Sequence, residues 1–425
     1  MTVQNNRIPP EIAAKLVNPV TYASDEIYDT YAWLRANQPL GVAEVDGFDP
    51  FWVVTTYDDL QAISKDNTAF PYGKRPSTLM DRQSLAQSMQ MSESPLALSL
   101  IQMDEPMHMQ YRLLTQSWFS PANLRQREGD VTAIARKAVE NLRAMGGSGD
   151  FVAGVALNYP LEVIMNILGV PEEDFPMMLK ITQDIFGPQD PDVKAQLAAM
   201  DQESISAIQR MVVEELITYF NGITEDRRAN PKDDLATVIA TAEIDGVPIA
   251  DNAINGYYLI VATAGHDTTS SSTSMGMWAL ATQEGLLERL KASPDLIPAF
   301  VEETIRWATP VKTFMRSAAH DIEINGQQIK ANDWLMLCYA SANRDEQAFS
   351  NPNAFDIDRD SNRHLAFGYG VHLCLGQILA KMEMRILWNE LIPQLKSVRL
   401  TGETKLTESY FVNGLKYLPI EFEMV

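Results

Sequence analysis

Residues able to do chemistry gather around one cysteine in a glycine-rich loop. The loop reads Phe367-Gly368-Tyr369-Gly370-Val371-His372-Leu373-Cys374-Leu375-Gly376, and a helix is predicted directly after it, from Leu375 to Leu391. Unpaired N–H groups and the dipole at the start of a helix favour a thiolate, which makes Cys374 a candidate metal ligand. Gly376 leaves room for a flat group to approach the backbone. Gly368 and Gly370 allow the backbone angles that turn N–H groups toward the sulfur.

Cys374 has two interpretations on residue type alone. It could be an unreactive buried thiol in a tight turn, because unpaired cysteine is among the most buried residues. It could also bind a metal: one cysteine cannot form a structural zinc site, but it can be the single axial ligand of a haem iron. Cys338 lies in an apolar run, Trp334 to Tyr339, and is predicted to be a buried strand residue.

A second group lies inside the longest predicted helix, Asp251 to Ala281, with Asp251 expected to cap it. Small or hydroxylated residues are spaced to share one face and form a shallow groove, namely Val261, Ala264, Gly265, Thr268 and Ser272. A mid-helix glycine costs about 1 kcal/mol relative to alanine, and such a conflict with helix propensity indicates a site. A close helix–helix contact is the alternative. His266 is expected on another face in a structural role.

Charged residues recur at helical spacing in two further segments. Glu303 and Arg306 are three residues apart, and His108 and Arg112 are four apart. In isolation, these pairs indicate only an exposed ion pair and a basic helix face.

Together, these segments resemble the cytochrome P450 superfamily, in its soluble bacterial class. The cysteine loop is similar to the family's haem-binding loop, Ala264 to Thr269 to its oxygen-activating segment, and Glu303-x-x-Arg306 to its Glu-x-x-Arg motif. The resemblance runs from Trp33-Leu34-Arg35 to Phe411-Val412. It implies a mainly α fold with small β-sheets, the cytochrome P450 fold, with haem b as cofactor and dioxygen as co-substrate.

The resemblance also implies a role for each group. Cys374 would be the thiolate ligand of the iron, and Asp267 and Thr268 would deliver protons to bound dioxygen. Glu303, Arg306 and Arg359 would brace the cysteine loop from outside. The other haem contacts would be His108, Arg112, Arg316 and His372 at the propionates, with Phe367, Gly368, Gly376, Ala264 and Gly265. The substrate wall would contain Val261, Ala264, Thr313, Phe314, Phe411 and Val412, with the Ser84–Leu100 loop and Ile185–Phe186.

These residues are mostly apolar or small, which predicts a small hydrophobic substrate, a terpenoid or alkyl-aromatic compound. Electrons are expected from a [2Fe–2S] ferredoxin and its reductase, because no flavin or nicotinamide domain is recognisable. Arg112, Arg125, Arg127 and Lys381 are candidates for a basic docking patch. The alternatives are a peroxide-driven peroxygenase, an oxidase of another substrate class, including carrier-bound substrates, and a non-enzymatic haem sensor.

Composition limits the class of protein. The 425 residues are 46% apolar and 21% charged, with a net charge of −22, which predicts a globular protein and disfavours nucleic-acid binding. We find no repeat or linker and expect one domain, residues 1–425. The N-terminal 20 residues are polar, so a cytoplasmic protein with no membrane association is expected. The presence of only two cysteines argues against a disulfide framework.

Helices are predicted to position the site. Periodicity predicts helices over Asp25–Asn37, Pro106–Phe119 and Asp295–Trp307. It also predicts long helices over most of the chain between Phe119 and Asn221, with breaks at Gly187-Pro188 and Asp190-Pro191. Short strands are expected near Trp52–Thr55 and between Phe314 and Leu337, with a turn at Asn325-Gly326. Gln83 to Leu100 is predicted to be a mobile loop, and Ser341 to His364 to be irregular.

Overall fold

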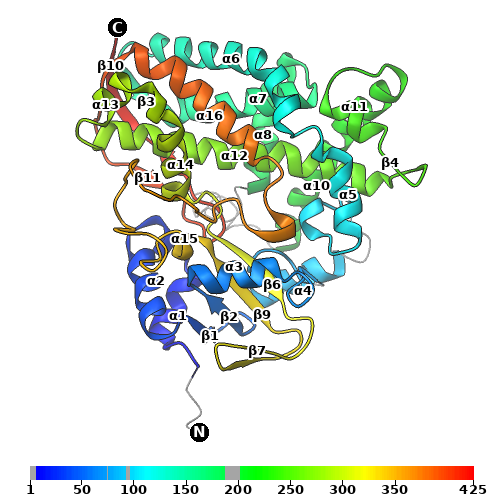
Figure 1. Ribbon diagram of the computed structural model, residues 1–425. Helices are drawn as coiled ribbons and strands as arrows, with labels where there is room; N and C mark the ends of the chain where they lie inside the picture. Colours follow the sequence, from blue (N-terminus) through cyan, green and yellow to red (C-terminus); the bar gives the residue numbers. More distant parts are fainter. Residues whose placement is uncertain (1–5, 74, 92–95, 187–201) are drawn as a thin grey trace.

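The computed structural model describes residues 6–73, 75–91, 96–186 and 202–425, and most of these residues are helical. Figure 1 shows the long helices in the upper part of the molecule and the largest sheet below them. The predicted mainly α fold with small sheets is confirmed. The α-helices are α1 (Pro10–Leu16), α2 (Glu26–Asn37), α3 (Tyr57–Lys65), α4 (Arg82–Met91), α5 (Met107–Gln116), α6 (Pro121–Ala144), α7 (Asn158–Leu168), α8 (Phe175–Phe186), α10 (Gln202–Ala229), α11 (Leu235–Ala240), α12 (Asp251–Thr282), α13 (Leu286–Ala292), α14 (Ile297–Ala308), α15 (Tyr339–Ala342) and α16 (Gln377–Leu391).

The strands form small sheets. The largest has the order β1-β2-β9-β6, with β1 (Leu40–Ala43), β2 (Phe51–Val54), β9 (Trp334–Cys338) and β6 (Thr313–Ser317). A second sheet joins β10 (Leu395–Leu400), β13 (Pro419–Met424) and β3 (Ser148–Asp150). The two-stranded sheets are β4 (Glu243–Ile244) with β5 (Val247–Pro248), β7 (Ile322–Ile324) with β8 (Gln327–Ile329), and β11 (Lys405–Leu406) with β12 (Leu415–Tyr417).

The largest sheet is buried on both faces. Strand β9 pairs in parallel with β2 and antiparallel with β6. Alternate side chains point to opposite faces of a strand. Trp334 and Met336 accordingly join a core cluster that includes residues of α1 and α2, whereas Leu335 and Leu337 join a second cluster that includes residues of α3. The sheet therefore anchors Phe314, in β6, beside the rest of the core.

Helix α12 crosses the centre of the molecule (Figure 1) and packs against α7, α8, α10 and α14. Its bounds confirm the predicted long helix. The predicted cap is wrong, however: Ala250 is the N-cap, and Asp251 is the first helical residue, with no side-chain capping bond. A carboxylate in the first turn still interacts favourably with the helix dipole.

The predicted loop from Gln83 is partly wrong, because Arg82–Met91 forms α4. The carboxylate of Asp81 accepts hydrogen bonds from the N–H groups of Gln83 and Ser84, as a helix cap does, and Leu85 is buried. The predicted turn at Asn325-Gly326 is confirmed, since both residues have positive φ, 51° and 76°. The predicted breaks near Gly187 and Asp190 lie outside the described residues.

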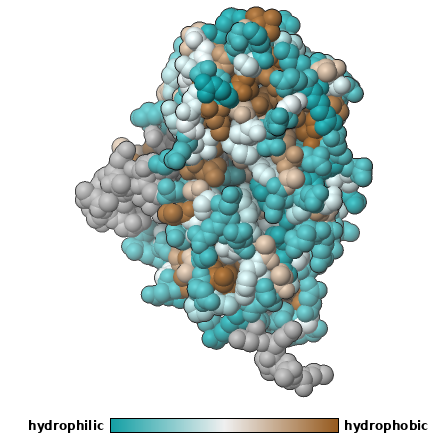
Figure 2. Space-filling model, turned by 90° about the vertical axis from the view of Figure 1, so that its left-hand side faces the viewer, coloured by the Kyte–Doolittle hydropathy of each residue, from teal (hydrophilic) through white to brown (hydrophobic). Residues whose placement is uncertain are grey.

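Among the described helices, none combines the length and the apolar composition needed to cross a bilayer. Figure 2 shows a largely hydrophilic face in which apolar residues are scattered or in small groups.

Candidate active site

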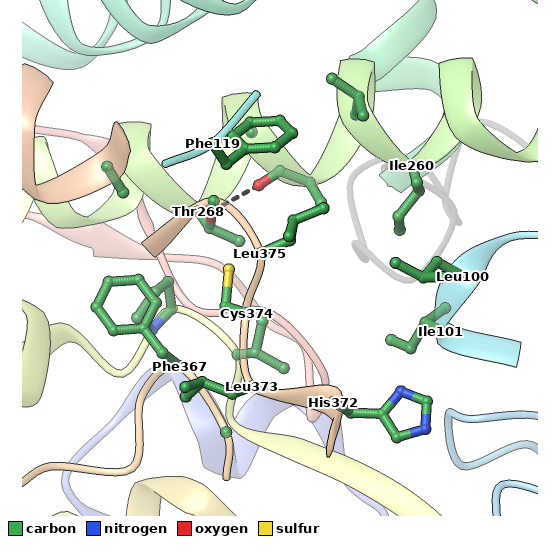
Figure 3. Close-up of a pocket in the computed structure, with 18 of the residues that line it drawn as sticks. Leu100, Ile101, Phe119, Ile260, Thr268, Phe367, His372, Leu373, Cys374 and Leu375 are labelled. Atoms are coloured by element: carbon green, nitrogen blue, oxygen red, sulfur yellow. Dashed lines mark hydrogen bonds between the residues drawn. The ribbon is translucent and has the colours of Figure 1, made fainter. Parts of the chain in front are cut away.

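A cavity lies between α12 and the loop that carries Cys374. Its empty volume, including its opening to solvent, is about 1450 Å³. In Figure 3 the sulfur of Cys374 points toward Thr268 on α12, with Phe367 and Leu373 beside it. Leu100 and Ile101, which come from the segment before α5, close another side. The lining of the cavity extends from the cysteine loop to α12 and on to Leu100 and Ile101, so a flat group and a smaller molecule beside it can both contact it.

The cysteine loop owes its shape to two glycines. Gly368 and Gly370 have φ of +72° and +75°, a region that side chains rarely adopt. A Cβ at Gly370 would also lie only 2.3 Å from the carbonyl oxygen of Ser64 at the end of α3. The loop is closed by a hydrogen bond of 2.9 Å from the N–H of Cys374 to the carbonyl oxygen of Phe367. The cysteine is thus held on a rigid turn against α3.

The groups around the sulfur have opposing effects on the pKa of the Cys374 thiol. Burial raises the pKa of the Cys374 thiol, while the N–H group of Gly376, the charge of Arg112 and the N–H group of Gln377 lower it, and the net direction is upward. The N–H groups expected near the sulfur are therefore present, and they come from the start of α16. As expected, they lower the pKa of the thiol and so favour the thiolate, but the loss of hydration has the larger effect.

Cationic and potentially cationic groups meet at one end of the cavity, from four separate elements. His108 and Arg112 come from α5, Arg316 from β6 and His372 from the cysteine loop. The rings of His108 and His372 have centroids 4.0 Å apart. Burial and the neighbouring positive groups lower the pKa of His372 to about 2, and burial lowers that of His108. The four groups that the sequence predicted at a propionate are therefore brought together.

Several polar atoms at this end lack a partner. His108 Nε2, His372 Nε2 and Arg316 Nε are buried and form no hydrogen bond with the described residues. Such atoms are costly unless a ligand or water satisfies them, and acceptor oxygens of an anion match the guanidinium. On the two faces of the cavity, Gly376 and Gly265 offer no side chain. A flat apolar group with carboxylates at one edge, such as haem b, fits this donor set.

On the opposite wall, α12 provides a small-residue surface. Val261, Ala264, Gly265 and Thr268 line the cavity, as the stripe predicts. The predicted groove and its alternative, a close helix contact, both hold for Gly265: a Cβ there would lie 2.9 Å from Cγ1 of Ile164 in α7. Ser272 is buried, and its hydroxyl donates to the carbonyl oxygen of Thr268 at 3.0 Å, so it does not extend the cavity.

Asp267 lies beside the cavity wall and is not among the lining residues. Its side chain is 22% exposed, and Oδ2 has no hydrogen-bond partner among the described residues. Burial raises the pKa of Asp267 to about 7. Neighbouring His266 is fully buried and contacts Thr182 of α8 and the carbonyl oxygen of Leu157. His266 thus points away from the cavity, on another helix face as expected.

Behind the cysteine loop lies a buried ion network. Glu303 and Arg306 form two hydrogen bonds of 2.7 Å, and both side chains are fully buried. Arg359 contacts both carboxylate oxygens of Glu303 at 3.1 and 3.2 Å, and Asn362 contacts Oε2 at 3.0 Å. Arg306 also donates to the carbonyl oxygens of Asn343, Pro352 and Ala354. The network joins α14 to the irregular segment that leads to the cysteine loop.

The structure divides the predicted substrate residues. Phe314 lines the cavity with Val261 and Ala264, but Thr313, Phe411 and Val412 are not among the described lining residues. Adjacent strand residues face opposite ways, so Thr313 cannot share the face of Phe314, and its hydroxyl donates to the carbonyl oxygen of Tyr410. Phe411 packs against Phe314 from behind, with ring centroids 5.4 Å apart. The side chains of Ile185 and Phe186 lie outside the described residues.

Sequence reasoning missed part of the lining. Ile260 and Tyr257 line the cavity one and two turns before Ala264, and the helical spacing of the stripe would have found them. Phe119, Ile164, Val311 and Tyr339 come from separate segments of the chain, so no local pattern links them to the site. Glu383 of α16 also lines it, and burial raises its pKa well above the usual value.

Comparison with known proteins gives the family. The cytochrome P450 family model matches residues 42–398. Cytochrome P450-terp of a Pseudomonas species, an α-terpineol hydroxylase, is 46% identical over 420 residues, 98% of each chain. A steroid C26-monooxygenase of Rhodococcus jostii (strain RHA1) is 30% identical over 96% of this chain and 84% of that relative.

Solved structures agree. CYP108D1 from Novosphingobium aromaticivorans superposes with a TM-score of 0.91 and 43% identity, covering 99% of this chain and 100% of that one. The Mycobacterium marinum cytochrome P450 CYP268A2, in complex with pseudoionone, has a TM-score of 0.86 and 30% identity over 96% of this chain and 97% of that one. With likeness along nearly its whole length and a cysteine that faces a small-residue helix across a broad cavity, this chain belongs to the cytochrome P450 family.

Proposed function

We propose that this cytochrome P450 monooxygenase hydroxylates a small hydrophobic substrate of the terpenoid or alkyl-aromatic kind, with electrons from a [2Fe–2S] ferredoxin and its reductase. The cavity between Cys374 and Thr268 carries the proposal. It combines a thiol on one face, a hydroxyl on the other and, at one edge, cationic or potentially cationic groups of which several have polar atoms without a hydrogen-bond partner among the described residues. The rest of its wall is largely apolar.

Haem b, the cofactor of the family, would be held by residues from both sides of the cavity. Cys374 would ligate the iron, and His108, Arg112, Arg316 and His372 would bind the carboxylates. When bound, haem supplies the iron at which dioxygen is activated for transfer of one oxygen atom to the substrate. Phe367, Gly368 and Gly376 would line the thiolate face, and Ala264 and Gly265 the opposite one.

Asp267 and Thr268 are the proposed proton donors. The Thr268 hydroxyl donates to the carbonyl oxygen of Ala264 at 2.7 Å, so it offers only acceptor lone pairs to the cavity until it turns. Turning costs about 1 kcal/mol, the net value of one hydrogen bond. Asp267 is partly exposed, so it can regain protons from solvent and pass them to Thr268 through water.

The substrate would lie above the haem, against apolar side chains. Ile260 and Val261 of α12, Leu100 and Ile101 of the segment before α5, and Phe314 of β6 supply this wall. A compact hydrocarbon gains most from leaving water in such a site. The relatives support a terpenoid-sized ligand, since P450-terp is an α-terpineol hydroxylase and CYP268A2 was solved with pseudoionone.

Spectral titration tests the substrate class. Monoterpene alcohols and alkyl benzenes should change the haem absorption at micromolar concentrations, because they fill the apolar wall and displace water. Fatty acids should bind more weakly, because the described residues of this apolar wall include no cation to pair with their carboxylate. Binding of the fatty acids alone would exclude the proposed class.

Replacing the cysteine tests the ligand. Reduced wild-type protein under carbon monoxide should show the thiolate-type absorption band, and Cys374→Ser should lose it while keeping its helical circular dichroism. Cys338→Ser is the matched control, since that thiol is buried in β9. A band that survives in Cys374→Ser would rule out the assigned ligand.

Peroxide-driven turnover that exceeds ferredoxin-driven turnover would favour the peroxygenase alternative.

A further inference from the structure

His266 precedes the proposed proton donor Asp267 and lies where three elements meet. Its Nε2 is 2.8 Å from the carbonyl oxygen of Leu157, just before α7, and its Nδ1 is 3.0 Å from Oγ1 of Thr182 in α8. The same Nδ1 is 3.5 Å from Oδ1 of Asp267. The histidine side chain is fully buried, and Thr182 is fully buried as well.

The hydrogen positions follow from the partners. A carbonyl oxygen only accepts, so Nε2 carries the ring proton. Burial lowers the pKa of His266 to about 4, so the ring is neutral near pH 7 and Nδ1 is an acceptor. The Thr182 hydroxyl is 3.0 Å from Nδ1 and 3.0 Å from the carbonyl oxygen of Leu179, and its single hydrogen can serve only one of them.

Two hydroxyl-type donors therefore compete for one acceptor. One is Thr182, and the other is the carboxyl group of Asp267 in its protonated form, whose Oδ2 has no other partner among the described residues. The helical carbonyl of Leu179 tolerates the loss of the Thr182 bond, because carbonyl oxygens in a helix already accept a backbone N–H. A donor at Nδ1 is thus available from α8 without a large cost.

We propose that Thr182 occupies Nδ1 of His266 and thereby prevents the imidazole from retaining the proton of Asp267, so that this proton stays available to Thr268. Thr182 and His266 are then positioning residues of the proton pair, supplied by α8 and by α12. In the step they support, the O–H bond of Asp267 breaks and its proton passes through water to the Thr268 oxygen. Thr268 passes its own proton to dioxygen as the electrons of the ferredoxin reduce it, and Asp267 regains a proton from solvent.

The inference rests on the proposed role of Asp267 and Thr268, and Thr182→Val tests it. Valine keeps the volume of threonine but removes the donor, so Nδ1 is left to Asp267. The product formed per electron pair should fall about five-fold, part of the roughly 10²–10⁴-fold that positioned proton transfer contributes. Peroxide release should rise correspondingly, and the solvent isotope effect on turnover should increase. Unchanged coupling in Thr182→Val would overturn the proposal.

Infrared spectroscopy supplies a readout that needs no turnover. The C=O band of the protonated carboxyl group, identified by its loss in Asp267→Asn, should move to lower frequency in Thr182→Val because the carboxyl now donates to Nδ1. Thr182→Ser keeps the donor and should match the wild type in band and coupling. The double variant Thr182→Val/His266→Phe removes the acceptor as well and should return the band toward its wild-type position. A band that is the same in all four proteins would refute the contact.

The two proposals fail in different ways. If Thr182→Val keeps the thiolate-type carbon monoxide band and normal substrate titration but its coupling is that of the wild type, the role of Thr182 is wrong and the monooxygenase assignment stands. If the wild type lacks that band, the proposed ligand is wrong, and the infrared shift still decides whether Asp267 and His266 interact.

Discussion

The carboxyl group of Glu303 is fully buried and that of Asp267 is partly buried, and the two differ because of the donors around them. Glu303 accepts hydrogen bonds from Arg306, Arg359, Asn362 and the backbone N–H of Asp356, which together use both of its oxygens. Asp267 has a neutral histidine beside it, and its pKa is raised to about 7. Glu303 is therefore suited to hold a segment in place, and Asp267 to give up and regain a proton.

Asp267→Asn should stabilise the protein in a pH-dependent way. The pKa of Asp267 rises from its ordinary value of 3.8 to about 7 in the folded protein, so the stability it contributes is complete below about pH 4 and is lost as pH rises through about 7. Asparagine does not titrate, so the variant does not lose stability in this way as pH rises. The gain in unfolding free energy should be about 2 kcal/mol larger at pH 8 than at pH 5, measured by urea unfolding. An equal gain at both pH values would contradict the raised pKa.

The same variant should show a change in the pH dependence of coupled turnover. In the wild type the donor form of Asp267 disappears as pH rises through about 7, so product per electron pair should fall above that pH. Asp267→Asn should have low coupling at every pH and should not show this fall above pH 7. If the fall persists in the variant, the titration of another group causes it.

Glu303→Gln should strongly destabilise the protein. Arg306 and Arg359 would be left as buried charges without a carboxylate, which costs about 3–5 kcal/mol when one partner of a buried pair is removed. The control is Glu214→Gln, at an exposed pair with Arg210 in α10, where about 1 kcal/mol or less is expected. Equal midpoints in urea for the two variants would rule out the bracing role.

At the scale of elements, α12 organises the site through the segments that cross it closely. Gly256 faces the backbone of Leu98, and Gly265 faces Ile164 of α7. The N–H of Leu98 donates to the carbonyl oxygen of Asn252 at 2.8 Å, which ties the segment carrying Leu100 and Ile101 to α12. One helix thus sets both the cavity wall and the hydroxyl that faces the cysteine.

Gly256→Ala should reduce ligand binding more than a substitution at an uncrowded glycine such as Gly222. A Cβ there would lie 2.0 Å from the carbonyl oxygen of Leu98, and a backbone neighbour cannot turn away as a side chain can. We expect the segment to shift and affinity for small hydrophobic ligands to fall about tenfold, or about 1.4 kcal/mol. Spectral titration measures this. Gly222→Ala in α10 meets no atom within 4 Å and should bind as the wild type does.

For the whole molecule, the charge balance affects the choice of electron donor. The net charge is −22, yet a basic patch is the predicted docking site for the proposed ferredoxin. The predicted docking patch is largely neutralised within the chain: Arg127 pairs with Asp233 at 2.5 Å, and Lys381 pairs with Glu302 at 2.8 Å. Arg112 donates to the carbonyl oxygen of Leu373, whereas Arg125 is exposed near the start of α6. Attraction should therefore be local and modest.

Arg125→Gln should raise the KM for the ferredoxin a few-fold at low ionic strength and have little effect at high salt, because exposed charges are screened beyond about 10 Å at 0.1 M. The carbon monoxide band should not change. The control is Lys396→Gln in β10, which Figure 1 places far from α5 and which pairs with Glu423. Ferredoxin-driven turnover that does not depend on salt in the wild type would argue against docking through this charge.

Much of the site could be predicted because it depends on local geometry. The positions of Gly368, Gly370 and Cys374 define a turn before a helix, and the spacing of Val261, Ala264 and Thr268 places them on one face of α12 whatever packs against it. The mainly α fold followed from similar periodicity. The helix at α4 was missed because its main signal, Asp81 as a cap, is a single residue. The single domain stays a prediction.

Amino-acid sequence by itself determined which residues share the cysteine loop and which share one face of α12, because backbone geometry links spacing to direction within one loop or helix. Tertiary structure alone decided which atoms meet across elements. Phe314 rather than Thr313 lines the cavity. Arg127 and Lys381 form ion pairs with acidic neighbours. His266 lies between Thr182 and Leu157. These outcomes depend on packing between distant segments, and no local spacing encodes it.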